Sequence, residues 1–179
     1  MIGVRALRLA WALGSVAALA LDQATKGLVR ARMPLHESIP VVPGLFHLTH
    51  VTNRGALFGM LHDLPDPWRA TIFTSVPLLA IGLILWFQVR TPAADHLAQG
   101  GLALILAGAV GNLADRLRFG QVTDFLDVFV GAHHWPAFNV ADASICVGVA
   151  LLMLDLLRHG RRPAATRPAP DPTHASRPV

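Results

Sequence analysis

The amino-acid sequence predicts an all-α integral membrane protein, in which four transmembrane helices carry a small β-containing cap outside the membrane. Hydrophobic residues make up 53% of the 179 residues, and the mean hydropathy is +0.48. Charged residues make up 15%, below the roughly 25% that is usual in soluble proteins. The apolar residues are concentrated in long runs, so the sequence is suited to a lipid bilayer.

Four apolar runs have about the length of a membrane span, since a hydrocarbon core of about 30 Å requires about 20 helical residues. They cover residues 9–29, 70–89, 97–114 and 137–157. The last three fit this length directly. The first is uncharged only from Leu9 to Leu21, and it spans the core only if its helix continues through Asp22 and Lys26.

The first run also has the features of a cleavable signal peptide, because basic residues precede a short apolar core that contains Ala18-Leu19-Ala20, with small residues at 18 and 20. Taken alone, the two interpretations are nearly equal. Lys26, Arg30 and Arg32 follow at helical spacing, which favours a helix that continues and stays in the mature chain.

The segments between the spans predict a cap on one side of the membrane. Residues 33–69 contain β-branched and aromatic residues bounded by Pro and Gly, which indicates short strands and a turn. Residues 118–136 form a second loop rich in apolar residues, which we expect to lie on the membrane surface. The membrane domain therefore covers residues 1–159, and the Arg/Pro/Ala tail at 160–179 is predicted to be disordered.

Charge gives the expected orientation and excludes one class of partner. Four spans place both termini on one side, and Arg158, Arg161 and Arg162 beside the last span favour the cytoplasm for that side. The net charge is +4, but the basic residues lie at the margins of the apolar runs and in the tail rather than on one face. We therefore expect no nucleic-acid partner.

Ionisable and amide side chains lie where a membrane makes them costly, at roughly 2.5–3.5 kcal/mol each near mid-membrane. Helical spacing places them in three groups, namely Asp22 with Lys26, Asn112 with Asp115 and Arg116, and Asn139 with Asp142. All three groups are expected near the outer membrane face. The loops bring Asn53, Arg54, Asp124 and Asp127 to the same face.

Each group also has a purely structural explanation. Asp22 and Lys26 are best explained as an ion pair, and Asn139 as a helix N-cap. Asp124 is equally well explained as a solvated loop charge. Asp142 is harder to explain in this way, because it lies between Ala141 and Ala143 in an apolar run with no basic residue nearby.

Five segments in order resemble the bacterial lipoprotein signal peptidases, also called type II signal peptidases. They are Asp22–Lys26, Asn53–Gly59, Gly111–Arg116, Val122–Asp127 and Phe138–Ser144. Each segment alone is weak, but five in order among four spans are specific, and no functional position departs from the family. The tail at 160–179 lies outside the resemblance.

The resemblance implies a membrane aspartyl endopeptidase whose catalytic pair is Asp124 and Asp142. It implies that the substrate-binding or supporting residues are Asn53, Arg54, Asn112, Arg116 and Asn139, with Asp22, Lys26 and Asp115 as structural polar residues. The substrate would be a prolipoprotein already carrying diacylglycerol, cut just before its lipid-modified cysteine at the outer face of the bacterial inner membrane. We expect no metal or organic cofactor, a monomer, and membrane lipids as the only other partner.

Two other functions are alternatives to this one, namely a metal-dependent phosphatidyltransferase and a transporter. Asp115, Gly120, Asp124 and Asp127 faintly resemble the metal motif of CDP-alcohol phosphatidyltransferases, but its upstream Asp and Asp-Gly pair are missing. A transporter would place its polar residues near mid-membrane, often in inverted repeats, and no repeat is visible.

Histidine and cysteine offer two weaker sites. A metal site built from His47, His50, His133 and His134 is disfavoured, because residues i and i+3 of a strand point to opposite faces. The single cysteine, Cys146, lies in an apolar stretch, where a thiol is inert.

Overall fold

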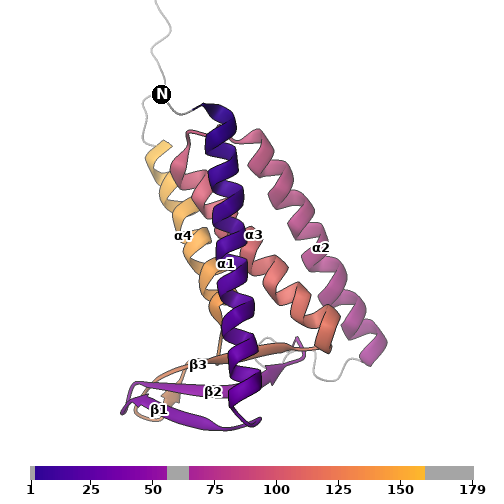
Figure 1. Cartoon of the computed structure of the whole chain (residues 1–179), viewed down its shortest axis with the longest axis vertical. Helices are drawn as coiled ribbons and strands as arrows, with labels where there is room; N and C mark the ends of the chain where they lie inside the picture. The colour runs from indigo at the N-terminus through magenta and orange to yellow at the C-terminus, as the bar shows by residue number, and fades with distance from the viewer. Residues whose placement is uncertain (1–2, 56–64, 160–179) are drawn as a thin grey trace, which may run out of the picture.

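The computed structural model describes residues 3–55 and 65–159, and it contains four long helices that run side by side (Figure 1). They are α1 (Val4–Arg32), α2 (Asp66–Arg90), α3 (His96–Phe119) and α4 (Val140–His159). Each contains a stretch long and apolar enough to cross a membrane. The prediction of four membrane-spanning helices is confirmed. The segment at 56–64 and the tail at 160–179, predicted to be disordered, lie outside the described residues.

The helix ends differ from the predicted spans mainly where polar residues gather. The third helix continues past residue 114 to Phe119 and ends at Gly120, whose φ of 71° is the left-handed conformation that glycine favours. The fourth helix begins at Val140 rather than at residue 137. The first begins earlier than residue 9 and continues through its charged residues to Arg32 without a break. Hydropathy marks the apolar part of each helix, whereas the helices themselves extend into the polar region beside the cap.

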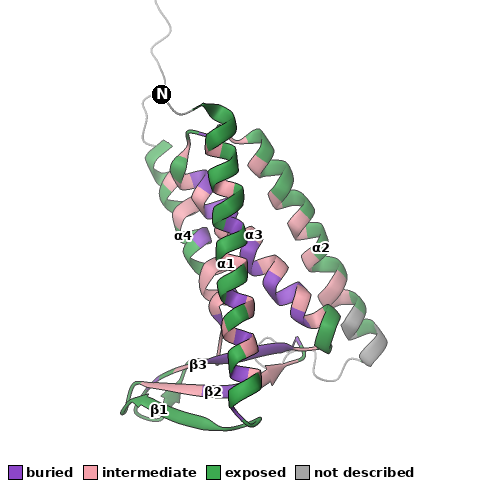
Figure 2. Cartoon of the chain, viewed as in Figure 1, coloured by how far each residue is buried: buried purple, intermediate pink, exposed green. Residues whose placement is uncertain are grey.

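Helix α3 is the centre of the bundle. Within its most apolar window 56% of the residues are buried, whereas this share is 11% or less in the other three helices. Figure 2 shows the contrast, with α1, α2 and α4 largely exposed on their outer faces. Exposed apolar side chains of this kind are what lipid tails would cover in a bilayer.

Close packing of α3 on α4 depends on small residues. A Cβ on Gly101 would come within 2.8 Å of the Gly148 backbone oxygen, and a Cβ on Gly108 would collide with the Ala141 backbone oxygen. Small residues at such positions let helix backbones approach closely in membranes. The contact matters for the site, because Ala141 lies beside Asp142.

We expect Gly108→Ala to destabilise the protein by about 1–3 kcal/mol, because the new methyl group must push the α4 backbone away. The measurement is thermal unfolding of the purified protein in detergent. The matched control is Gly82→Ala in α2, where a Cβ meets nothing within 4 Å and the more helix-prone alanine should be neutral or stabilising. Equal stability of the two variants would contradict this account of the α3–α4 contact.

The cap is a four-stranded antiparallel sheet in the order β1-β2-β3-β4, at the end of the bundle where α1 and α3 finish and α4 begins (Figure 1). Its strands are β1 (Ser38–Val42), β2 (Phe46–Asn53), β3 (Val122–Val130) and β4 (His133–His134). The predicted strands and turn between the first two helices are confirmed. The prediction that residues 118–136 form a loop is wrong, because Val122–Val130 form a strand of nine residues.

Strand β3 connects the cap to the bundle. It pairs with β2, with Asp124 opposite Val51, and its first four residues are all buried. Phe125 packs against Val29 and Met33 at the C-terminal end of α1. This packing fixes the position of Asp124, which is 3% exposed, at the boundary between the sheet and the helices.

Candidate active site

The first turn of α4 is closed by two of the predicted site residues. The Asp142 backbone N–H donates to the Asn139 side-chain oxygen at 2.9 Å, and the Asn139 backbone N–H donates to Asp142 Oδ2 at 3.2 Å. This reciprocal pattern is a capping box formed by Asn and Asp. Asn139 is therefore a helix cap, as its structural explanation requires, and the same hydrogen bonds hold the Asp142 carboxylate in place.

Two asparagines bridge Asp124 and Asp142. Asn139 Nδ2 donates to Asp124 Oδ1 at 2.6 Å and to Asn112 Oδ1 at 3.2 Å. Asn112 Nδ2 donates to Asp142 Oδ1 at 2.8 Å. The predicted pair is thus brought together from β3 and α4, with α3 supplying the second bridge.

The two carboxylates have different surroundings. Asp142 is half-buried, and both of its oxygens accept hydrogens, from Asn112 and from the Asn139 backbone. Its place in the first turn of α4 also puts it near the positive end of the helix dipole. An ionised carboxylate, which only accepts, suits this position.

Asp124 lies outside the membrane-spanning helices, and its burial raises its pKa to about 7. The negative charge of Asp142 raises this pKa further, whereas hydrogen bonds from Asn139 and Asn53 and the charge of Lys26 oppose the shift. At neutral pH a large fraction of Asp124 therefore carries a proton. The pair offers one acceptor and one donor of protons at the same place.

Behind the pair lies a buried network of charges on α1 and α3. Lys26 Nζ lies 3.0 Å from Asp22 Oδ2 and 3.3 Å from Asp115 Oδ2, and all three side chains are at most 1% exposed. Arg30 also reaches Asp115, at 3.5 Å. The predicted ion pair of Asp22 and Lys26 is present, and it is part of a larger network.

Two predicted arginines occupy different places. The charge of Arg116 acts on Asp142, Asp124 and Asp115, and its guanidinium lies over the Phe73 ring, 5.6 Å from the ring centre. Its Nε is buried and has no hydrogen-bond partner among the described residues. Arg54 is exposed and donates to Gln121 at 3.4 Å, so the structure does not bring its side chain to the pair.

Asn53 lies at the end of β2 and hydrogen-bonds Asp124. Its side-chain oxygen accepts from the Gly55 backbone N–H at 2.8 Å. Gly55 has a φ of 102°, and a Cβ there would collide with Phe73. A glycine is therefore required at this turn.

Comparison with known proteins gives the family. The family described as "Signal peptidase (SPase) II" has a sequence model that matches residues 15–158. The lipoprotein signal peptidase of Geobacter sulfurreducens is 51% identical over 146 residues, which cover 82% of this chain and 90% of that protein. That of Syntrophus aciditrophicus is 50% identical over 140 residues, covering 78% and 87%. The chain belongs to the signal peptidase II family.

The fold agrees with this membership. A bacterial membrane enzyme solved by the in meso method matches with a TM-score of 0.72 and 27% identity, over 88% of this chain and 94% of that one. A second such structure matches with a TM-score of 0.70 and 30% identity, over 83% and 93%. The protein is a multi-pass membrane protein of the signal peptidase II family.

Other candidate groups lie apart from the pair in this signal peptidase II fold. Asp127, three residues after Asp124 on β3, binds the exposed His134 at 2.9 Å. Residues an odd number apart on a strand face opposite ways, which separates Asp127 from Asp124. His50 hydrogen-bonds the Met33 backbone oxygen at 2.8 Å, whereas His47 packs on Phe129. Among the described residues, the histidines of the cap form no group of three possible metal ligands.

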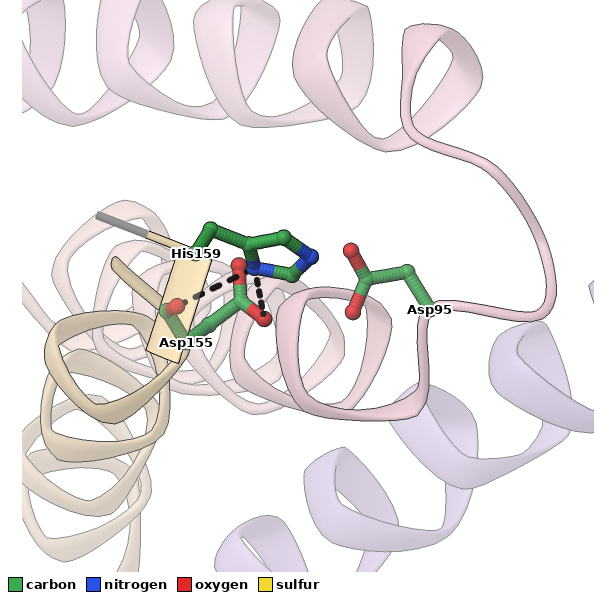
Figure 3. Close-up of side chains that lie close together, drawn as sticks. All are labelled: Asp95, Asp155 and His159. Carbon is green, nitrogen blue, oxygen red and sulfur yellow. Dashed lines mark hydrogen bonds and ion pairs between the residues drawn. The ribbon is translucent and has the colours of Figure 1, made fainter. Parts of the chain in front are cut away.

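One group of possible metal ligands does occur among the described residues, at the opposite end of the bundle. It consists of Asp95, Asp155 and His159, and the His159 ring lies between the two carboxylates (Figure 3). Asp95 already caps α3 by accepting from the Ala98 backbone N–H, and Asp155 already pairs with His159 at 3.1 Å. Each of these contacts lies within one helix end, so the group is explained by the capping of α3 and by an ion pair within α4.

The sequence interpretation missed two members of the buried network. Gln23 donates to Asp22 and to Asp115, at 3.0 and 3.3 Å, and Arg30 donates to Thr123 at 3.0 Å. Arg30 stands four residues after Lys26, so the helical spacing of the two cations was a usable signal. Nothing comparable marks Gln23, whose partner Asp115 lies on another helix.

Proposed function

We propose that this member of the signal peptidase II family is an aspartic endopeptidase that removes signal peptides from prolipoproteins, with Asp124 and Asp142 as its catalytic pair. The observation that carries the aspartic type is the pair itself, in which one buried carboxyl with a raised pKa is bridged to a second carboxylate that receives two hydrogen bonds. Such a pair can share one proton between unequal sites.

Hydrolysis then follows in two steps, each with two proton transfers. Asp142 takes a proton from a water molecule as the water oxygen bonds to the scissile carbonyl carbon. Asp124 gives its proton to the carbonyl oxygen, which forms a tetrahedral diol. The diol collapses, the C–N bond breaks, and Asp142 passes its proton to the leaving amine while the second hydroxyl returns a proton to Asp124. Both carboxyl groups end in their starting states.

The polar residues around the pair would hold the substrate. Arg116 has a buried N–H without a partner among the described residues, which a substrate carbonyl could accept. Asn53 and Asn139 hydrogen-bond Asp124 and would keep it oriented during the reaction. We include Arg54 only as a residue of the rim, because it is exposed.

The substrate class and the location are part of the proposal. The relatives that match are named lipoprotein signal peptidases. A diacylglyceryl group on the cysteine after the cleaved bond could leave its acyl chains against the exposed apolar faces of the helices. The site would lie at the outer face of the bacterial inner membrane with both termini in the cytoplasm. The sheet lies at the end of the bundle opposite to the start of α1 and the end of α4 (Figure 1), and the basic residues beside the last span favour the cytoplasm for those helix ends.

Cleavage of a synthetic lipobox peptide by the purified protein tests this function. We expect a single cut just before the cysteine when it carries diacylglycerol, at an unchanged rate in EDTA, because carboxylates alone activate the water. The matched substrate is the same peptide with an unmodified cysteine, which should be cut much more slowly. Loss of activity in EDTA that a divalent metal restores would overturn the aspartic mechanism, and equal cleavage of both peptides would overturn the substrate class.

A further inference from the structure

Lys26 is a fully buried cation that the cleavage chemistry does not itself use. It is 0% exposed, and its ammonium group contacts three side chains. Two are the carboxylates of Asp22 and Asp115, at 3.0 and 3.3 Å. The third is the Asn112 side-chain oxygen, to which Lys26 donates at 2.8 Å. The two carboxylates are sufficient to balance the charge of Lys26, so charge balance does not explain its contact with Asn112.

The contact with Asn112 decides which way this amide faces. Asn112 Oδ1 accepts from Lys26 and from Asn139, and its Nδ2 consequently points to Asp142 at 2.8 Å. An amide side chain has similar shape in both orientations, so its neighbours select one. An ammonium group is only a donor, and it can face only the oxygen end.

We propose that Lys26 is a positioning residue for peptide cleavage, which fixes the Asn112 amide so that its N–H group holds the Asp142 carboxylate as the base. This inference rests on the proposed function of the pair. Asn112 is the link through which Lys26 acts, and the substrate does not touch Lys26 at any step.

The carboxylates that hold Lys26 also belong to the arrangement. Asp22 Oδ1 accepts from the Ala141 backbone N–H at 2.9 Å, next to Asp142 in the first turn of α4. Asp115 accepts from the Thr123 backbone N–H at 3.3 Å, next to Asp124 on β3. Helix α1 is therefore joined to both members of the pair through charged groups that water does not reach.

The charged groups that face the pair set the expected effect on pH dependence. Those at the pair are Arg116, Asp124 and Asp142, and those in the network behind it are Asp22, Lys26, Arg30 and Asp115. The positive charge of Lys26 lowers the pKa of Asp124. Removal of this charge should therefore raise the pKa of Asp124 further.

The test is Lys26→Met, with cleavage of the diacylated lipobox peptide measured from pH 4 to pH 9. We expect kcat to fall about tenfold or more, as for loss of a hydrogen bond to a charged group, with KM within about threefold of the wild type. We also expect the alkaline limb of kcat/KM, which the proposed mechanism assigns to Asp124, to move to higher pH. Partial misfolding would lower the measured rate at every pH, but it would not shift the limb of the profile along the pH axis.

Arg30→Met is the matched control, because Arg30 is a second cation on α1 that contacts Asp115, and among the described residues its contacts do not include Asn112. Its alkaline limb should stay close to that of the wild type, because Arg30 is not among the charges that shift the pKa of Asp124. A Lys26→Met protein that keeps the wild-type limb, or shares that of Arg30→Met, would overturn the positioning role. A wild-type protein that does not cleave the peptide would instead overturn the proposed function.

A second variant covers the case in which Lys26→Met leaves an unpaired buried carboxylate and does not fold. Lys26→Met combined with Asp22→Asn removes one positive and one negative charge together. The asparagine keeps an acceptor for the Ala141 N–H. We expect kcat to be about tenfold or more below that of Asp22→Asn alone, and a difference within about twofold would overturn the proposal.

Discussion

Asp142→Asn is expected to abolish cleavage while the protein keeps its fold. The asparagine can still accept from the Asn139 backbone N–H through its oxygen, so the cap of α4 survives. A carboxamide cannot take a proton from water, and loss of the base lowers kcat by about 10²–10⁴-fold. The measurement is single-turnover cleavage of the diacylated lipobox peptide, with thermal unfolding in detergent as the check on the fold.

The matched control for this variant is Asp127→Asn. Asp127 is a cap carboxylate that pairs with the exposed His134, and it faces away from the pair. The control should keep nearly full activity. Near-normal cleavage by Asp142→Asn, or a loss of activity of similar size in Asp127→Asn, would contradict the assignment of Asp142 as the base.

Asp124→Asn is expected to remove cleavage as completely, and the wild-type protein should reveal the same group through its pH dependence. The pKa of Asp124 is raised to about 7 by burial and by the charge of Asp142. Its proton is required on the scissile carbonyl, so kcat/KM should fall as the pH rises through about 7. The measurement is the rate from pH 5 to pH 9, and a rate that is flat across pH 7 would contradict the role of Asp124 as the acid.

Stability offers a readout of Asp124 that does not depend on activity. A carboxyl whose folded pKa lies above its unfolded value stabilises the protein below the unfolded pKa, and this contribution is lost as the pH rises through the folded pKa. The shift from 3.8 to about 7 corresponds to about 4 kcal/mol at most. Asp124→Asn should therefore be more stable than the wild type at pH 8 and differ least at pH 4. If Asp124→Asn is less stable than the wild type at pH 8, the fold favours the ionised form of the Asp124 carboxylate. This result would contradict the raised pKa.

The sequence predicts the membrane helices well because each of them must contain an apolar run long enough to cross the bilayer. A long apolar run is a local property, and it can be read without knowing what packs beside it. The polar residues within these runs are equally visible. Asp142 was marked as functional by its place between Ala141 and Ala143, and the structure puts it beside Asn112 on the neighbouring helix.

The cap was harder to predict because its pairing is not local. Asp124 lies opposite Val51, more than seventy positions away in the chain, and only this pairing with β2 makes Val122–Val130 a buried central strand. Its β-branched and aromatic residues were a usable signal, but the same residues also suit a loop on a membrane surface. The exposed position of Arg54 could not be foreseen either, since it depends on how the turn at Gly55 directs the chain.

Asn139 has a consequence for the biogenesis of the protein. It caps α4, bridges Asp124 to Asn112, and follows three of the four helices in the order of synthesis. Until α4 is in place, Asp124 on β3 has neither Asn139 nor Asp142 beside it. Under the proposed mechanism, cleavage begins only when the last helix docks, so an incompletely inserted chain would not cleave its neighbours in the membrane.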